Sequence, residues 1–198
     1  MNIESIKTSI NNYRLLVNKG NRDILVKLFS QADGIFFEKP FFNKVEEYLR
    51  LYLAEEEGEL YGLLTTDYRC PSKWDSTTEV FSAKFNSFAE SKYGDYTDYK
   101  NPTSPKHPNY ISEGTASLRI NLWKNRKSAW TVNNISSNTV VRFFEIPTAG
   151  FQNDQSNYFS LGQNESTSHI DLMLGNDSGL YDMVRPVPPF PPKTQWPK

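Results

Sequence analysis

The sequence predicts an α+β fold of two tandem modules, each an N-terminal helix packed on a small antiparallel β-sheet, related by a pseudo-two-fold axis. Three observations predict this fold. Apolar residues recur at helical spacing in two segments, apolar and polar residues alternate in the segments that follow, and the pattern repeats after 110 residues. The expected domains are a first module at 1–70, a linker at 71–110, a second module at 111–185 and a Pro-rich tail at 186–198.

The repeat is visible in hydrophobic class and order more than in identity. Three pairs of segments align at the 110-residue spacing: 10–14 with 120–124, 48–51 with 158–161, and 60–64 with 170–174. Between the first two pairs the spacing rises to 115, where 26–29 aligns with 141–144. A duplication explains the match, and the alternative is two unrelated α+β segments that align by chance.

The first expected element is an amphipathic helix over residues 3–18. Its apolar side chains fall every three or four residues: Ile3, Ile6, Ile10, Tyr13 and Val17. Asn2 is a suitable N-cap. Lys19 and Gly20 predict the end of the helix, because glycine adopts the left-handed conformation without strain.

Three strands are expected after this helix, at 24–29, 48–55 and 59–66. The sequence Glu56-Glu57-Gly58 predicts a hairpin turn between the second and third strands, with Gly58 supplying a positive φ. The second module repeats this order. Ser112 is expected to cap a helix that runs to residue 128, and strands are expected at 139–146, 157–163 and 168–174.

The linker at 71–110 has apolar residues near helical spacing, which predicts a short helix around 77–92. These residues are Val80, Phe81, Phe85, Phe88 and Ala89. From Tyr93 to Tyr110 the chain combines prolines with tyrosines and has no apolar period, so this part is expected to be irregular.

Side chains alternate across a strand, so each predicted hairpin has an apolar face and an opposite face. The apolar faces, which include Leu51 and Leu161, are expected to lie against the helices. The opposite faces form a candidate binding face: Tyr48, Arg50, Tyr52, Tyr61, Tyr158, His169 and Asp171. Tyr and Arg are typical of interface cores. Three readings stay open: the modules pack these faces together, linker aromatics cover them, or they bind a partner.

No residue pattern predicts catalysis, a cofactor or a metal site. His169 and Asp171 share a strand face, where a carboxylate can orient an imidazole for acid–base work. No nucleophile motif accompanies them, and the first module has Glu59 and Tyr61 at the matching positions. The chain has two His and one Cys, which is fewer than a typical zinc site uses.

Charge and hydropathy exclude further classes of protein. The chain carries 22 Lys and Arg against 23 Asp and Glu, whereas nucleic-acid binding requires a basic surface. No apolar run is long enough for a transmembrane helix, the start lacks signal-peptide features, and the single Cys70 cannot form an internal disulfide. We therefore expect a cytoplasmic protein without nucleic-acid, membrane or metal partners, and secretion by a signal-less route stays open.

The tail is the most distinctive motif. Its proline content favours the polyproline II conformation, which loses little entropy when it docks. The candidate contact residues are Arg185, which directly precedes the tail, and Pro186, Pro188, Pro189, Phe190 and Trp196 within it. The tail is expected either to lie along its own domain, with Phe190 and Trp196 as anchors, or to engage a partner.

The module plan and this ending resemble a group of small, uncharacterised bacterial α+β proteins with an RP-x-PP-F-like C-terminal segment. The matching residues are Ile120, Trp123, Lys124, Ile146, Pro147, residues 158–174 and residues 185–190. The resemblance covers the second module well and the first loosely, since the first has at most Arg69-Cys70-Pro71 in place of the Pro-rich ending. It implies no activity.

The sequence thus leads to three functional hypotheses. The first is a non-enzymatic protein-binding or adaptor module that uses the Tyr-rich strand faces or the Pro-rich tail, with another protein or a second copy as partner. The second is a small-molecule-binding protein or weak enzyme with a site in the inter-module cleft. The third is a self-assembling structural component.

Overall fold

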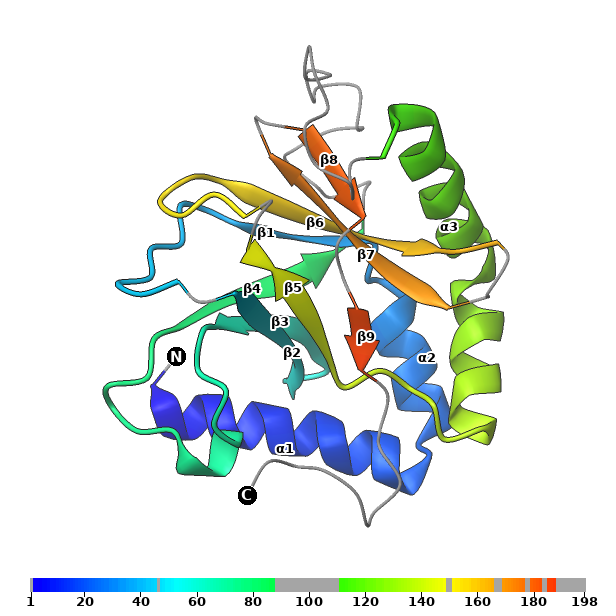
Figure 1. Ribbon diagram of the computed structural model, residues 1–198. Helices are drawn as coiled ribbons and strands as arrows, with labels where there is room; N and C mark the ends of the chain where they lie inside the picture. Colours follow the sequence, from blue (N-terminus) through cyan, green and yellow to red (C-terminus); the bar gives the residue numbers. More distant parts are fainter. Residues whose placement is uncertain are drawn as a thin grey trace.

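The computed structural model describes residues 2–45, 47–87, 111–148, 151–165, 169–176, 179–182 and 185–187. Within these residues the protein is α+β, as predicted (Figure 1). The helices are α1 (Ile3–Lys19), α2 (Arg22–Ser30), the single 3₁₀ turn η1 (Pro71–Lys73) and α3 (Glu113–Ser136). The strands are β1 (Gly34–Phe37), β2 (Tyr48–Glu56), β3 (Glu59–Thr65), β4 (Val80–Asn86), β5 (Phe143–Pro147), β6 (Asn157–Gln163), β7 (Ile170–Asn176), β8 (Gly179–Asp182) and β9 (Arg185–Val187).

The described strands form one antiparallel sheet in the order β8-β7-β6-β1-β4-β3-β2-β5-β9. Strand β4 turns the corner of this sheet, because residues 80–84 pair with β3 and residues 85–86 pair with β1. At the far end β9 lies close to β7, so the sheet curls into a nearly closed barrel. The expectation of a separate small sheet in each module is wrong, since β1 pairs with β6 and β2 pairs with β5.

Helix α1 forms as predicted from its spacing and caps. The Asn2 side chain accepts a hydrogen bond from the backbone N–H of Ser5 at 2.8 Å, which satisfies one of the free donors of the first turn. Gly20 ends the helix in the left-handed conformation at φ 61°. These two residues set the bounds of the helix and hence the position of its polar face.

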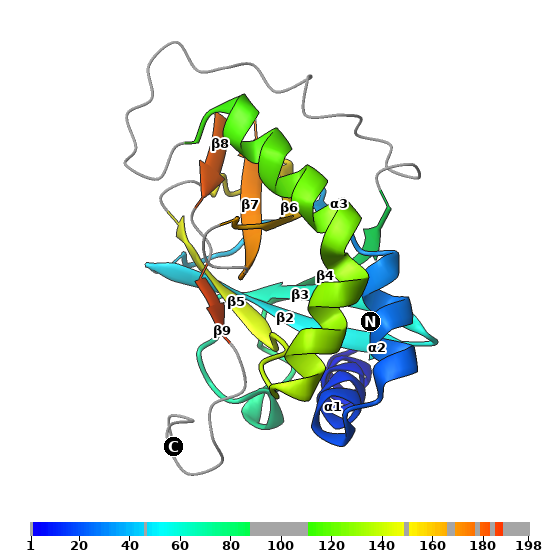
Figure 2. The ribbon, with the colours of Figure 1, turned by 90° about the vertical axis from the view of Figure 1, so that its right-hand side faces the viewer.

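The strand predicted at 24–29 is wrong, because this segment forms helix α2. Leu25, Leu28 and Phe29 are fully buried, and their spacing of three and four residues places them on one side of a helix. Ile24 remains 39% exposed. A short apolar run fits either a strand or a helix, and packing against α3 decides the outcome here (Figure 2).

The second module is closer to prediction. Ser112 caps α3 by accepting from the N–H of Thr115 at 3.2 Å. The helix continues to Ser136, beyond the expected end at 128, because Trp130 packs edge-on against Phe29 with ring centroids 5.5 Å apart. The expected strand at 139–146 begins only at Phe143, whereas β6 has the predicted bounds.

The turn between β2 and β3 has two central residues with positive φ, Glu57 at 54° and Gly58 at 80°. The predicted need for glycine at position 58 is therefore confirmed. The helix predicted around 77–92 is wrong, because residues 80–86 form β4 with neighbours on both sides. The irregular segment predicted at 93–110 lies outside the described residues.

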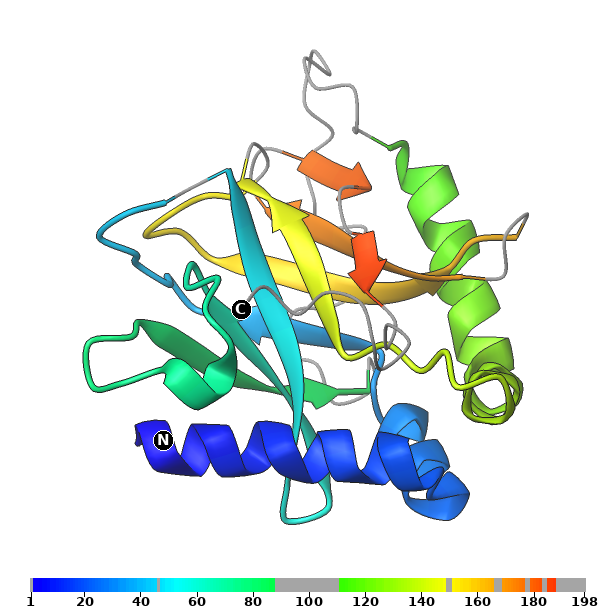
Figure 3. The same cartoon turned by 60° about the horizontal axis from the view of Figure 1, so that its bottom comes forward.

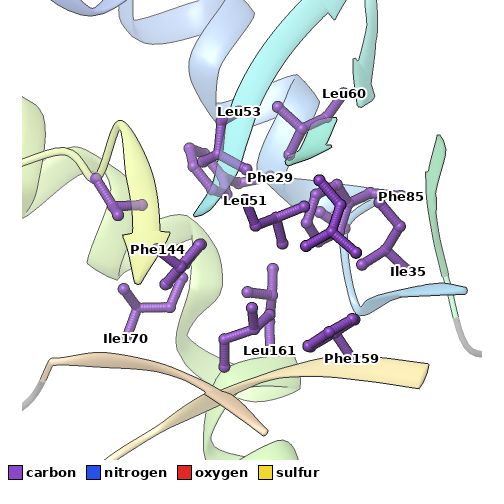
Figure 4. Packing of buried hydrophobic residues seen from close by; sticks show 14 of the residues in the cluster. Phe29, Ile35, Leu51, Leu53, Leu60, Phe85, Phe144, Phe159, Leu161 and Ile170 are labelled. Atoms are coloured by element: carbon purple, nitrogen blue, oxygen red, sulfur yellow. The ribbon is translucent and has the colours of Figure 1, made fainter. Parts of the chain in front are cut away.

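The main core lies between the two halves of the curled sheet (Figure 4). Leu51 and Leu53 face Phe159 and Leu161 across it, and α2 closes one side with Phe29. The apolar strand faces were expected to lie against α1 and α3, but they mainly face one another. Burial of each such side chain stabilises the fold by roughly 1.5–3 kcal/mol.

The two long helices cover the outer faces of the sheet. The N-terminal half of α1 packs on the outside of β2, β3 and β5 through Ile6 (Figure 3). The N-terminal half of α3 packs on the outside of β6 and β7 through Ala116 and Ile120. Further along, Tyr13 of α1 and Trp123 of α3 join the main core. The helices therefore cover part of the tyrosine-bearing faces.

Candidate functional site

A pocket with a volume of about 410 Å³ lies beside α1. Its walls come from four parts of the chain that are distant in sequence: the polar side of α1, the outer face of β2, residues 70–72 and the start of β5. Helix α1 can border the pocket because its apolar residues are used against the sheet, which leaves Lys7, Asn11 and Arg14 on the accessible side.

The floor of the pocket is aromatic. Tyr52 and Phe143 stack with ring centroids 5.2 Å apart and an angle of 29° between their planes. Trp74 packs edge-on against Tyr52, with a centroid distance of 5.3 Å. The three side chains are at most 7% exposed. Tyr52 and Phe143 line the pocket, and Trp74 packs against Tyr52 without lining it. The aromatic rings of the two lining residues are a surface that a flat ligand can contact.

Arg50 contacts both aromatic residues of the floor, Tyr52 and Phe143. Its guanidinium lies 5.3 Å from the centroid of Phe143 and donates to the hydroxyl oxygen of Tyr52 at 3.4 Å. It also forms an ion pair with Glu145 at 3.4 Å and donates to the carbonyl oxygen of Tyr68 at 3.0 Å. Burial raises the pKa of Tyr52, and the charge of Arg50 only partly opposes this rise. Tyr52 is therefore a neutral phenol near neutral pH.

Two arginines line the pocket above this floor. Arg142 is half-buried, and one of its Nη atoms donates to the side-chain oxygen of Asn18 at 2.5 Å. Its Nε atom is buried and has no hydrogen-bond partner in the described part of the chain. Arg14 lies on the exposed face of α1 and, among the described residues, makes no ion pair. Burial lowers the pKa of Arg142, and the positive charge of Arg14 lowers it further.

The other charged lining residues are Glu4 and Lys7, which pair with each other at 2.8 Å. Three positive charges against one negative charge leave the described lining with a net charge of +2. Tyr13, at the base of the pocket, donates its hydroxyl to the carbonyl oxygen of Val141 at 2.8 Å. The next residue is Arg142, whose carbonyl oxygen accepts from the N–H of Leu53 at 3.0 Å. These bonds hold the backbone of Arg142 in place.

Residues 70–72 form the opposite rim. Cys70 is partly exposed, and the hydroxyl of Ser72 donates to its sulfur at 3.3 Å. The indole N–H of Trp74 donates to the carbonyl oxygen of Arg69 at 3.1 Å, which ties the rim to the aromatic floor. Cys70 is the single cysteine of the chain.

A polar network outside the rim fixes this loop. Arg69 forms ion pairs with Asp67 at 2.6 Å and with Asp75 at 3.3 Å. Partial burial raises the pKa of Asp67, but hydrogen bonds from Arg69 outweigh this and hold it below its usual value of 3.8. The rim therefore keeps its charge network at neutral pH.

The structure separates the residues of the predicted binding face. Tyr52 is in the pocket floor, Arg50 supports that floor, and Tyr61 packs half-buried in the same apolar cluster. Tyr48 is 38% exposed, and its carbonyl oxygen accepts from the hydroxyl of Tyr68. These four residues share the outer face of β2 and β3.

The remaining members lie on or beside the face of β6 and β7. Tyr158 is buried beneath α3, and Asp171 forms an ion pair with Arg119 of α3 at 3.2 Å. His169 is exposed. None of the three lines the pocket beside α1.

Among the candidate tail contacts, Arg185 and Pro186 lie in β9. The other four lie outside the described residues: Pro188, Pro189, Phe190 and Trp196.

Sequence reasoning missed both arginines and the cysteine of the pocket. Arg14 could have been found, because Lys7, Asn11 and Arg14 recur at helical spacing along one flank of the apolar stripe of α1. No sequence pattern near Arg142 predicts that it lies in a pocket. It enters the pocket only because β5 pairs with β2, and the residues that pair are about 95 positions apart.

Over the described ranges, no group of three or more His, Cys, Asp and Glu has the geometry to hold a metal ion. In that same part of the chain, each helix is too short or too polar to cross a membrane. Comparisons of the chain with protein-family models, with curated proteins and with solved structures gave no match.

Proposed function

We propose that the protein binds a small molecule in the pocket beside α1. The observation that carries this proposal is the stacked, buried pair of Tyr52 and Phe143 at the floor of a 410 Å³ pocket. Small-molecule sites are typically concave, of roughly 300–1,000 Å³, and mostly apolar with a few placed polar groups. This pocket has that combination, with a cluster of charged and polar side chains around an aromatic floor.

The single cysteine makes the proposal testable without knowledge of the ligand. Cys70 lines the pocket, so a library of disulfide-forming fragments presented to the full chain should be captured selectively there. Fragments whose bodies fit the floor should resist competition by a reductant, and intact-mass spectrometry measures this resistance.

The matched control is Cys70→Ser combined with Ser136→Cys, which moves the thiol to an exposed position near the end of α3. We expect some fragments to be captured at least tenfold more strongly at Cys70 than at the control thiol. Equal capture of every fragment at both positions would contradict the proposal.

A second candidate function is binding of another protein or of a second copy. The segment between β1 and β2 and the first residue of β2 favour it, because Phe41, Val45 and Tyr48 are 51%, 38% and 38% exposed. Large apolar side chains gathered at a surface mark interaction sites. If this surface mediates self-association, Phe41→Ser with Tyr48→Ser should lower the sedimentation coefficient measured at high concentration. If the unmodified chain and the double variant both sediment as monomers, the hypothesis of self-association is wrong.

We also propose that the chain arose by duplication, with its halves related by a pseudo-two-fold axis. The pairing of strands between the two halves supports the duplication. Ile146 of β5 is opposite Leu49 of β2, and Ile35 of β1 is opposite Phe159 of β6. Leu49 and Phe159 are 110 residues apart, so equivalent positions of the two halves each pair with a strand of the other half. Each half also sends one long helix to the outer face of the sheet.

Residues 111–198 alone test the duplication. If the halves are equivalent, β5 of one copy should pair with β6 of another copy as it now pairs with β2, and a symmetric dimer results. Sedimentation equilibrium with circular dichroism should show a folded dimer. A fragment that stays unfolded at high concentration would argue that the halves are not interchangeable.

A further inference from the structure

The pocket beside α1 carries more positive charge than its own side chains neutralise. Glu4 is the only acidic residue among the described lining side chains, and Lys7 already pairs with it. Arg14 and Arg142 are left without an ionic partner in the described part of the chain, and they lie near enough for their charges to repel. Two unpaired guanidinium groups that share one pocket gain most from a negative charge placed between them.

The surroundings of Arg142 point the same way. Its Nε atom is buried, yet it has no acceptor among the described residues. A buried donor left unpaired is costly, and most such groups in proteins find a partner. One Nη atom is already used by Asn18. The guanidinium of Arg142 therefore has N–H donors that can bind an acceptor from outside the chain.

The floor defines the rest of the ligand. Tyr52 and Phe143 line the same pocket as Arg14 and Arg142 and give it an aromatic surface. A ligand with an apolar or aromatic body can cover this surface while an acidic group attached to it reaches the arginines. A bare inorganic ion would leave the floor uncovered and would gain nothing from it.

We infer that the ligand of this pocket is an organic anion: a carboxylate, sulfonate or phosphate attached to a flat apolar body that lies on Tyr52 and Phe143, with the acidic group between Arg14 and Arg142. This inference rests on the proposed function, since it names the class of small molecule that the pocket takes. Arginine binds such groups through two parallel hydrogen bonds, which fixes the orientation of the ligand as well as its charge.

Two fluorescent probes that differ only in the acidic group test the inference. 8-Anilinonaphthalene-1-sulfonate carries a sulfonate, and N-phenyl-1-naphthylamine has the same aromatic body without it. Titration of each into the full-length protein at low ionic strength measures both affinities. We expect the sulfonate probe to bind at least tenfold more tightly, and the difference to shrink at high salt because screening weakens the attraction.

Variants locate the binding. Arg14→Gln with Arg142→Gln should weaken the sulfonate probe at least tenfold and leave the neutral probe within about twofold. The matched control is Arg126→Gln, an exposed arginine of α3 that does not line the pocket, and it should change neither affinity. Circular dichroism and thermal melting establish that each variant is folded, and the single substitutions replace the double one if it is not.

The outcomes separate the inference from the proposed function. If both probes bind equally and the arginine variants change neither affinity, the pocket binds small molecules but the inference of an anion is wrong. If neither probe binds saturably and neither slows the alkylation of Cys70 by N-ethylmaleimide, the proposed function itself fails. Tight binding of the sulfonate probe that Arg126→Gln abolishes would place the site elsewhere and overturn the inference.

Discussion

The hydroxyl of Tyr13 donates a hydrogen bond of 2.8 Å to the carbonyl oxygen of Val141, 128 residues further along the chain. Tyr13 is 1% exposed and belongs to α1, whereas Val141 lies just before β5. The bond therefore joins the first helix to the segment that carries Arg142 into the pocket. The contribution of this bond to the free energy of unfolding can be measured, and so can the change of that free energy with pH.

Replacing Tyr13 with Phe should lower the free energy of unfolding by about 1–2 kcal/mol, because the carbonyl oxygen of Val141 loses a buried donor. Urea unfolding at pH 7 measures the change. Tyr61→Phe is the matched control, since Tyr61 is only half-buried and its hydroxyl makes no hydrogen bond in the described structure. Equal effects of the two substitutions would contradict a special role for the bond.

The same tyrosine predicts a loss of stability in alkali. Burial raises the pKa of Tyr13 above its usual value of 10.0 and outweighs the opposing effect of Arg142. Because the folded pKa lies above the unfolded one, the stabilisation is complete below pH 10 and falls as the pH rises beyond it. The free energy of unfolding should drop by up to about 1.4 kcal/mol per pH unit for this residue. Tyr13→Phe should show a shallower fall between pH 10 and pH 11.

Arg50 and Glu145 should be energetically coupled. Their side chains are 13% and 29% exposed, so the 3.4 Å ion pair is better shielded than a surface pair. Arg50→Gln leaves Glu145 unpaired and removes the donor to the carbonyl oxygen of Tyr68. We expect a loss of about 1–3 kcal/mol for the single variant, and a smaller additional loss when Glu145→Gln is combined with it. Strictly additive losses in urea unfolding would show that the pair is uncoupled.

Two glycines should respond to alanine in opposite directions. A Cβ atom at Gly62 of β3 would lie 2.5 Å from Ile35 and 2.8 Å from Leu51, inside the main core. Gly62→Ala should therefore destabilise the protein by about 1–3 kcal/mol. At Gly114 in α3 the nearest atom would be 3.9 Å away, and alanine has the higher helix propensity. Gly114→Ala should raise the melting temperature, and a fall would contradict the open surroundings assigned to it.

Deletion of residues 186–198 should destabilise the sheet at its β5 edge. Pro186 and Val187 are paired with Phe144 and Phe143, and Phe143 is part of the pocket floor. Removing them should lower the melting temperature by several degrees and increase the rate of Cys70 alkylation by N-ethylmaleimide. The control is deletion of residues 191–198, which leaves β9 and the three residues after it in the chain. If the longer deletion changes neither quantity, β9 contributes nothing to the edge or to the pocket.

The local elements of this protein were predictable where one strong signal acts alone. Helix α1 has a cap at each end and an unbroken apolar stripe, and the structure confirms it. Strand β6 has the predicted bounds, and Gly58 marks a turn that needs a positive φ. The predictions of a strand at 24–29 and of a helix around 77–92 are wrong, because each rests on a short apolar run whose conformation depends on its neighbours. Packing against α3 makes the first a helix, and pairing with β1 and β3 makes the second a strand.

The sequence by itself determined the α+β class, the bounds of α1 and β6, and which faces of β2, β3, β6 and β7 enter the main core, because helical spacing, caps and alternation are local properties of the chain. Tertiary structure alone decided that the halves share one sheet and that the pocket exists. Arg14, Tyr52, Cys70 and Arg142 have no common local pattern. They meet because β2 pairs with β5, a long-range contact whose formation depends on the burial of both strand faces and on no signal near any one of these residues.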